Sequence, residues 1–117
     1  MEDSFRLRVH FFRSRTGGEP VREWLLELDR EDRKAIGEDV KTVQFGWPLG
    51  MPLVRKVEPG LWEVRSRLVG RIARVIFTVD DQVMVLLHGF IKKSQKIPAA
   101  ELNTARVRFA QYKEQAP

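Results

Sequence analysis

Three strand-like segments separated by short turns dominate the second half of the chain and limit the folds it can adopt. Residues 61–68 alternate apolar and polar side chains, and residues 71–79 and 83–90 follow after turns of two and three residues. Consecutive strands joined by such short turns pair in antiparallel fashion. The last segment is apolar at every position before His88, so we expect it to lie inside the sheet with both faces covered.

Amphipathic patterns predict three helices around these strands. Pro20 is well placed to begin the first helix, Asp29 to cap the second and Pro98 to begin the last. Residues 6–12 are rich in strand-forming side chains, and residues 52–57 suit a further short strand. The first two helices follow each other closely, so we expect them to form an antiparallel hairpin that covers the sheet.

The length of 117 residues suits one domain with a modest core. We therefore predict a single α+β domain over residues 1–117. Its architecture is an antiparallel β-meander with an N-terminal helical hairpin and a C-terminal helix.

Composition excludes several classes of protein. The chain has no cysteine and two well-separated histidines, which rules out thiol catalysis and cysteine-ligated zinc, so we expect no metal and no cofactor. No apolar run approaches the roughly 20 residues of a membrane-spanning helix. The N-terminus lacks the basic-then-apolar order of a signal peptide. We expect a soluble cytoplasmic protein without membrane contacts.

The charge of the chain is unevenly distributed. Residues 19–41 carry eight acidic and five basic side chains, whereas residues 55–108 carry eleven basic and five acidic ones. The first region is typical of a solvated helical layer, and the second indicates a surface for a polyanion such as nucleic acid. The alternative is a basic protein whose cations are simply solvated.

A lysine cluster follows the last predicted strand. Lys92, Lys93 and Lys96 come after the apolar strand and before the proline that opens the final helix. This order places cations at the end of a buried strand, near a helix N-terminus that itself favours phosphate. The alternative is that these lysines are only solvated, as lysine pairs in loops often are. His88 is expected to be a semi-buried structural residue rather than a catalytic base.

Two strand arginines are further candidates. Arg74 lies between two isoleucines on a face that would ordinarily be buried, so it needs an ionic partner or a cleft. One interpretation is an ion pair with a helix carboxylate such as Glu101, and the other is bidentate binding of phosphate. Arg65 lies on the polar face of its strand, either solvated or paired with Glu63. Glu63 could act as a base, but its arginine neighbours would stabilise its ionised form and make it a weaker proton acceptor.

The chain resembles a known family in three successive blocks. Residues 61–65, residues 74–77 and residues 87–98, with the run Gly-Phe-Ile-Lys-Lys followed by Lys-Ile-Pro, resemble the RelE/HigB-like toxins and, more closely, their phage-derived branch. The final helix continues the same pattern at Glu101, Ala105, Arg108 and Tyr112.

The resemblance implies a toxin of a type II toxin–antitoxin pair. Such toxins cleave mRNA on the ribosome by attack of a ribose 2′-hydroxyl on the adjacent phosphodiester. A cognate antitoxin, often a helix-turn-helix protein, neutralises them. By this resemblance Arg65 and Arg74 are predicted to bind the phosphate and its transition state, and Lys92 and Lys93 to position RNA or transfer protons. Further RNA-binding cations are predicted to be Lys56, Arg67, Arg71, Lys96 and Arg108.

Two other hypotheses remain open. Related toxins of this fold poison a different target, such as DNA gyrase, without cutting RNA. An inactive relative would keep the basic RNA-binding surface but perform no chemistry.

Overall fold

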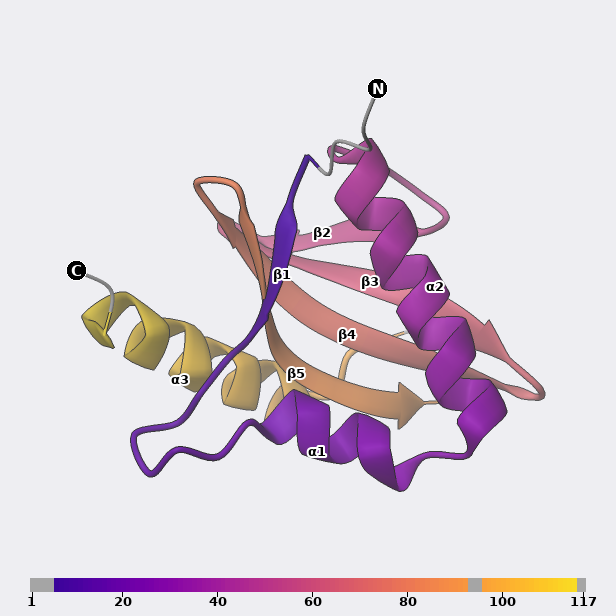
Figure 1. Ribbon diagram of the computed structural model, residues 1–117, viewed down its shortest axis with the longest axis horizontal. Coiled ribbons are helices and arrows are strands. Elements are labelled where there is room, and N and C mark those ends of the chain that lie inside the picture. The colour runs from indigo at the N-terminus through magenta and orange to yellow at the C-terminus, as the bar shows by residue number, and fades with distance from the viewer. Residues whose placement is uncertain (1–5, 93–95, 116–117) are drawn as a thin grey trace.

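The protein forms a five-stranded sheet with helices on both faces (Figure 1). The computed structural model describes residues 6–92 and 96–115. Its elements, in chain order, are β1 (Arg8–Phe11), α1 (Pro20–Glu27), α2 (Arg30–Gly46), β2 (Val54–Glu58), β3 (Leu61–Leu68), β4 (Arg71–Asp80), β5 (Val83–Lys92) and α3 (Ala99–Gln115). The predicted α+β class is confirmed.

The sheet is mixed rather than purely antiparallel. Its strand order is β1-β5-β4-β3-β2, in which β2 to β5 pair with antiparallel neighbours and β1 pairs with β5 in parallel. The expectation of a wholly antiparallel sheet is therefore wrong at β1. Two helices and three strands separate β1 from β5 along the chain, and a connection of that length permits parallel pairing. As predicted, β5 is an interior strand.

The turns of the antiparallel part are tight. Gly60, Gly70 and Asp81 have φ angles of 84°, 69° and 58°. Positive φ values of this kind suit glycine and, less often, aspartate or asparagine, and they match the twist of the strands on either side. These turns fix which residues of β2, β3, β4 and β5 lie opposite one another.

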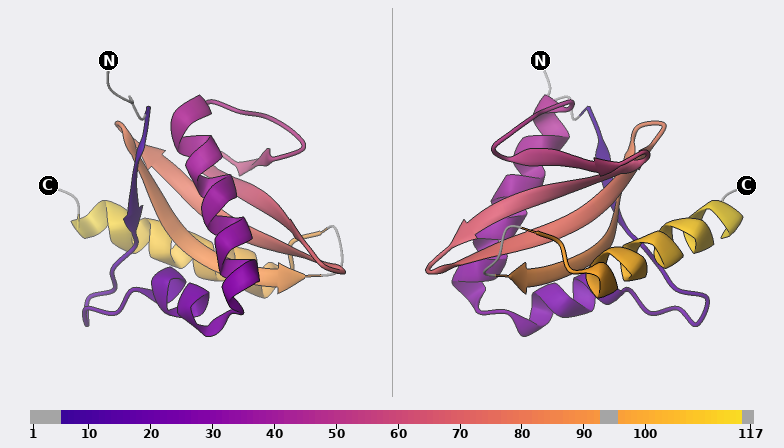
Figure 2. Two further views of the ribbon diagram at one scale, coloured as in Figure 1. Left: turned by 45° about the vertical axis from the view of Figure 1, so that its right-hand side comes forward. Right: turned by 180° about the vertical axis from the view of Figure 1, so that it is seen from behind.

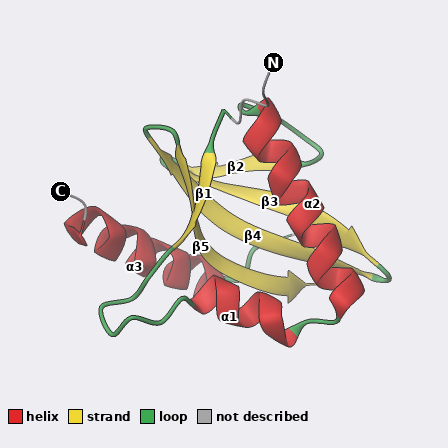
Figure 3. Cartoon of the chain, in the orientation of Figure 1, coloured by secondary structure: helices red, strands yellow, loops and turns green. Residues whose placement is uncertain are grey.

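The N-terminal helices cover one face of the sheet but pack on different strands. α2 lies against β3, while α1 lies against β5 (Figures 1 and 2). A Cβ atom at Gly89 would collide with the Trp24 ring, so this glycine lets α1 approach β5 closely. Figure 3 shows that α1 and α2 meet at an angle. The predicted antiparallel pairing of these two helices is not confirmed. Asp29 precedes α2 as predicted, although its side chain forms no capping hydrogen bond.

The two faces of the sheet have separate apolar clusters. We call the side covered by α1 and α2 the α1–α2 face; its buried residues include Val64, Val75, Phe77 and Leu86, which pack with Ile36, Val40 and Val43 of α2. We call the opposite side the α3 face; its buried residues include Leu61, Ile76, Val85 and Leu87, which pack with Leu102, Ala105, Phe109 and Tyr112 of α3. The apolar stripe predicted for the last helix is confirmed.

Polar contacts also hold α3 on the sheet. The Tyr112 hydroxyl donates a 2.7 Å hydrogen bond to Asp80, and Arg106 forms a 2.7 Å ion pair with Glu58. Partial burial and the Asp80 carboxylate raise the pKa of Tyr112 to about 12. The hydrogen bond from Arg106 holds the pKa of Glu58 below its usual value.

Within the described residues, no helix has the length and apolarity needed to cross a membrane.

Candidate functional site

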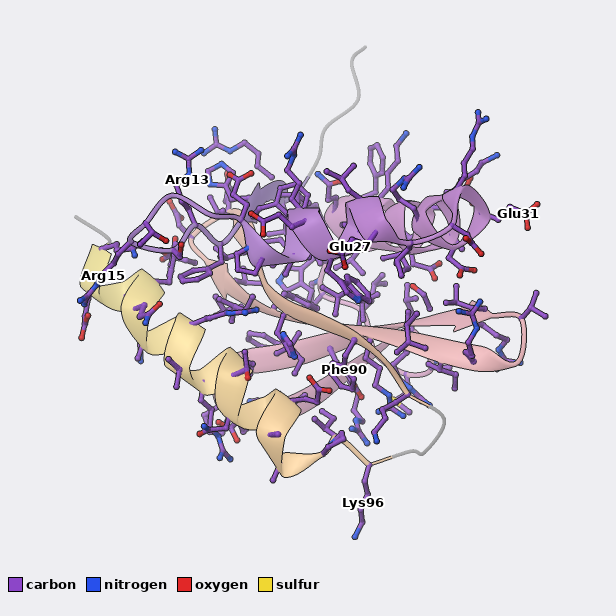
Figure 4. The ribbon with its side chains drawn as sticks, turned by 90° about the horizontal axis from the view of Figure 1, so that it is seen from below. Arg13, Arg15, Glu27, Glu31, Phe90 and Lys96 are labelled. Carbon is purple, nitrogen blue, oxygen red and sulfur yellow. The ribbon has the colours of Figure 1, made fainter. Side chains whose placement is uncertain are left out.

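Two cross-strand rows of side chains lie on the α3 face near the β3–β4 turn. In the first, Arg65 of β3 is opposite Arg74 of β4, which is opposite Phe90 of β5. Side chains that are opposite each other across paired strands lie on the same face. Figure 4 shows Phe90 on the side of the sheet next to the first turns of α3. The predicted ligands Arg65 and Arg74 are therefore direct neighbours.

The second row brings two further cations to the same area. Arg67 of β3 is opposite Ile72 of β4, and Ile72 is opposite Lys92 at the end of β5. Arg67 is exposed, while Ile72 and Lys92 are half-buried. α3 packs farther along the sheet, on the half of the face that contains Leu61. Arg65, Arg67 and Lys92 thus share a part of the α3 face that α3 leaves open.

The buried centre of the first row is an ion-paired arginine. The side chains of Arg74 and Glu63 are both fully buried, and Arg74 Nη1 lies 3.3 Å from each Glu63 carboxylate oxygen. Arg55 Nε of β2 lies 2.7 Å from Glu63 Oε2. One carboxylate therefore holds two guanidinium groups. A buried charge of this kind is tolerated only when it is paired.

The predicted partners of these charges differ from the observed ones. Glu101, expected as a partner for Arg74, instead lies 2.5 Å from His88 Nε2. Glu63, expected as a partner for Arg65, is shared by the arginines at positions 55 and 74. Glu63 is fully buried, although the alternation of residues 61–68 placed it on the polar face of its strand.

Two hollows lie beside Arg65, Arg67 and Lys92. The first has a volume of about 240 Å³ and is lined by Asp39, Pro52, Leu53, Arg65, Arg67 and Ile72. The second is more open, about 530 Å³, and is lined by Arg67, Leu68, Gly70, Arg71, Ile72 and Lys92. They share Arg67 and Ile72, so they are neighbours on the surface.

His88 is held by groups on both sides of its ring. Nε2 contacts Glu101, Nδ1 lies 3.1 Å from Arg108 Nη1, and the ring stacks on Phe90 with centroids 5.6 Å apart. Because Arg108 can only donate, Nδ1 accepts this hydrogen bond and Nε2 carries the proton. Neither nitrogen is open to a substrate, which supports the structural interpretation of His88.

A family model matches most of this chain. The family is described as "Phage derived protein Gp49-like (DUF891)", and the match covers residues 23–110. The chain belongs to this family. It is a toxin-like family related to the RelE/HigB type II toxins, and membership implies an antitoxin as partner. No curated protein matches the chain significantly.

Two predicted RNA-binding cations of this Gp49-like chain contact other parts of the molecule. The Lys56 Nζ atom lies over the Trp62 ring on the α1–α2 face, 5.9 Å from the ring centroid. Arg71 lines the more open hollow, but its guanidinium is tied to Asp32 of α2 at 2.9 Å. The structure does not bring these two cations together with Arg65.

The remaining predicted cations have different surroundings. Arg108 of α3 donates to the Leu87 carbonyl oxygen at 2.9 Å, and burial lowers the pKa of its guanidinium. Lys96 is exposed and points away from the body of the protein (Figure 4). Lys93 lies outside the described residues.

Sequence reasoning missed two charged residues of this area. Arg55 reaches the α3 face by pairing across the sheet with Glu63, and Asp39 of α2 lines the hollow next to Arg65. The signal for Arg55 was the isolated carboxylate of Glu63 in a strand with apolar neighbours, which needed a cationic partner. No local pattern pointed to Asp39.

Proposed function

We propose that this protein is the toxin of a type II toxin–antitoxin pair that cleaves mRNA on the ribosome. The main support is that Arg65, Arg67 and Lys92 lie together on the open half of the α3 face. Three cations on rigid paired strands form a preorganised surface for a phosphodiester backbone. Membership of a toxin-like family supports the same function.

The chemistry we propose is an internal transfer of the phosphodiester. The ribose 2′-oxygen forms a bond to the adjacent phosphorus while the bond from phosphorus to the 5′-oxygen breaks. The products are a 2′,3′-cyclic phosphate and a 5′-hydroxyl. The 2′-hydroxyl loses its proton to water, and the ammonium of Lys92 gives a proton to the departing 5′-oxygen. Arg65 and Arg67 stabilise the charge that develops on the phosphate oxygens.

We propose different roles for the neighbouring residues Arg65 and Arg74. Arg65 is half-buried beside the hollow and can contact RNA, whereas Arg74 is fully buried against Glu63. Direct contact of Arg74 with the transition state would require its guanidinium to leave this ion pair. Its burial favours a positioning role, in which Arg74 and Glu63 together fix Arg55 at the edge of the site. Lys93 and Lys96 are proposed to contact RNA beyond Lys92.

Controlled expression in cells tests this function. We expect the wild-type protein to stop growth and to create new 5′ ends within translated messages. Arg65→Ala and Lys92→Ala should abolish those ends, because each removes a cation from the open area. Lys56→Ala is the matched control, since it removes an exposed cation from the opposite face, and it should remain toxic.

Two results would contradict the proposal. Growth arrest without new 5′ ends would exclude nuclease action and point to another target such as DNA gyrase. No effect on growth would indicate an inactive RNA-binding relative. Co-purification with the product of an adjacent helix-turn-helix gene would identify the antitoxin.

A further inference from the structure

The smaller hollow contains opposite charges that do not pair with each other. Asp39 of α2 lines it together with Arg65 and Arg67 of β3. Among the described residues, none of these three side chains forms an ion pair within 4.0 Å. The Nε atom of Arg65 is buried and has no hydrogen-bond partner within that same part of the chain. A buried donor without a protein partner is uncommon and calls for an explanation.

The walls of this hollow combine three kinds of chemistry. Guanidinium groups only donate hydrogen bonds, and an ionised carboxylate only accepts them. The remaining lining is apolar and comes from Pro52, Leu53 and Ile72. A ligand that matches this set needs acceptors on one edge, N–H donors on another, and a flat apolar body. A bare phosphate does not match it, because the carboxylate would repel a second anion.

The size of the hollow limits the ligand further. Its volume of about 240 Å³ lies below the roughly 300–1,000 Å³ typical of sites for drug-sized molecules. A single planar nucleobase is therefore a better match than a nucleotide or a peptide. Single-stranded RNA presents such bases, and proteins read them by stacking and by hydrogen bonds to their edges.

Guanine is the base whose edges agree best with these side chains. Its N1–H and N2–H₂ groups are adjacent donors that one carboxylate can accept together. Its O6 and N7 atoms are acceptors that an arginine can bind in bidentate fashion, the commonest base-specific contact in protein–DNA complexes. Adenine lacks the paired donors, and uracil has one N–H between two carbonyl groups.

We propose that this hollow is a guanine-binding subsite, in which Asp39 accepts from N1–H and N2–H₂ and Arg65 donates to O6 and N7 from the Nε side of its guanidinium. The other end of the Arg65 guanidinium and Arg67, which lines both hollows, remain for the phosphate. The proposal rests on the proposed function, because it assumes that RNA lies across the open half of the α3 face. It assigns to Asp39 a role in sequence preference that is separate from phosphate binding.

Binding of short RNAs tests the subsite directly. The probes are labelled pentamers UUXUU, with X as guanine, adenine, cytosine or uracil and with a 2′-O-methyl group on every ribose, so that no 2′-hydroxyl can attack a phosphodiester. We expect the guanine pentamer to bind about tenfold more tightly than the adenine pentamer, as measured by fluorescence anisotropy. Replacing guanine by inosine, which lacks the N2 amino group, should remove part of this preference.

Variants at two neighbouring residues complete the test. Asp39→Asn should abolish the preference for guanine and make inosine equivalent to it, while binding of the uracil pentamer stays within about twofold. Glu38→Gln is the matched control, because Glu38 is exposed on α2, carries the same charge and does not line the hollow. It should keep the wild-type preference.

The possible results separate the subsite from the wider function. Equal binding of all four pentamers would overturn the subsite and leave the RNA surface standing. A preference for cytosine, or a guanine preference that survives Asp39→Asn, would overturn the proposed contacts. If no pentamer binds, the hollow is not an RNA-base site, and mapping of 5′ ends in cells decides the nuclease proposal independently. The base series with wild-type protein gives a result even if Asp39→Asn fails to fold.

Discussion

The two faces of the sheet differ in what their side chains are used for. Along β3, Trp62, Val64 and Leu68 enter the apolar cluster under α1 and α2. The alternate positions Glu63 and Arg65 face the other way, one fully buried and one beside a hollow. The same eight-residue strand therefore supplies a dry core on one side and a charged surface on the other.

The α1–α2 face mainly stabilises the fold, whereas the open half of the α3 face holds the candidate site. Apolar burial on the α1–α2 face stabilises the fold at little electrostatic cost. The buried ion pair of Glu63 and Arg74 is a poor source of stability, because both charges lose their hydration. Sequences break local rules in this way mainly at functional sites. Five predictions test the contrast between the faces.

The largest effect is expected from breaking the buried ion pair. Glu63→Ala should lower the free energy of unfolding by about 3–5 kcal/mol, because it leaves the Arg74 guanidinium buried without its carboxylate. Urea denaturation measures the loss. Glu38→Ala, which removes an exposed carboxylate, should change stability by less than about 0.5 kcal/mol.

A double variant sharpens this result. Glu63→Leu combined with Arg74→Met replaces the pair by apolar side chains and should recover most of the lost stability. It should not recover RNA cleavage, because Arg55 has lost the carboxylate that holds it. Recovery of both properties would show that the ion pair has no role in the site.

Truncating the core on the opposite face should affect stability alone. Leu86 is buried in the cluster under α1 and α2, and Leu86→Ala should cost about 2–5 kcal/mol through lost packing and a residual cavity. RNA affinity, measured at a temperature where the variant is folded, should equal that of the wild type. A parallel loss of affinity would mean that the two faces are mechanically coupled.

Removing one exposed cation should have the reverse pattern. Arg67→Ala should leave the free energy of unfolding within about 0.5 kcal/mol of the wild type. It should reduce the dependence of log affinity on log salt concentration by about 0.7 for one lost phosphate contact with single-stranded RNA. Titration of the uracil pentamer at several salt concentrations gives this slope. Lys56→Ala should leave the slope unchanged, and an equal effect there would contradict a site confined to the α3 face.

The smallest effect concerns the attachment of α3. The pKa of Tyr112 is raised to about 12 in the folded protein, above its value of about 10 in an unfolded chain. The neutral phenol therefore favours the folded state, and this contribution is complete below pH 10 and is lost as the pH rises through about 12. The difference in stability between wild type and Tyr112→Phe, followed by denaturation from pH 9 to 12, should shrink over that interval. A constant difference would show that the phenol does not titrate in this way.

Local sequence patterns predicted most of the secondary structure. The alternation over residues 61–68 gave the bounds of β3 as observed, because a buried face imposes a period of two on a strand. The predicted strand at residues 52–57 is observed at Val54–Glu58. Local patterns could not predict that β1 pairs in parallel with β5, or that α1 packs on β5 and α2 on β3. These contacts depend on which distant strand each element meets, and a local pattern contains no information about that.

The neighbours in the candidate site depended on one irregularity. Counting back from the turn at Gly60 without a bulge would place Lys56 opposite Glu63. A β-bulge between Lys56 and Glu58 shifts the register, so that Arg55 takes this position and Lys56 lies over Trp62. A shift of one residue moves side chains to the other face of the sheet. Because of this shift, Arg55 lies on the α3 face, and Lys56, which was predicted to bind RNA, lies on the opposite face.

The sequence alone determined the α+β class, the strands of the antiparallel part, the apolar stripe of α3 and the excess of cations in the second half. These features follow from local periodicity, turn residues and composition, which each segment carries within itself. The tertiary structure decided that Arg74 pairs with Glu63, that Arg55 and not Lys56 joins the α3 face, and that Asp39 lines the same hollow as Arg65. Such contacts join residues far apart in the chain, and they depend on register and helix placement that only the packed sheet fixes.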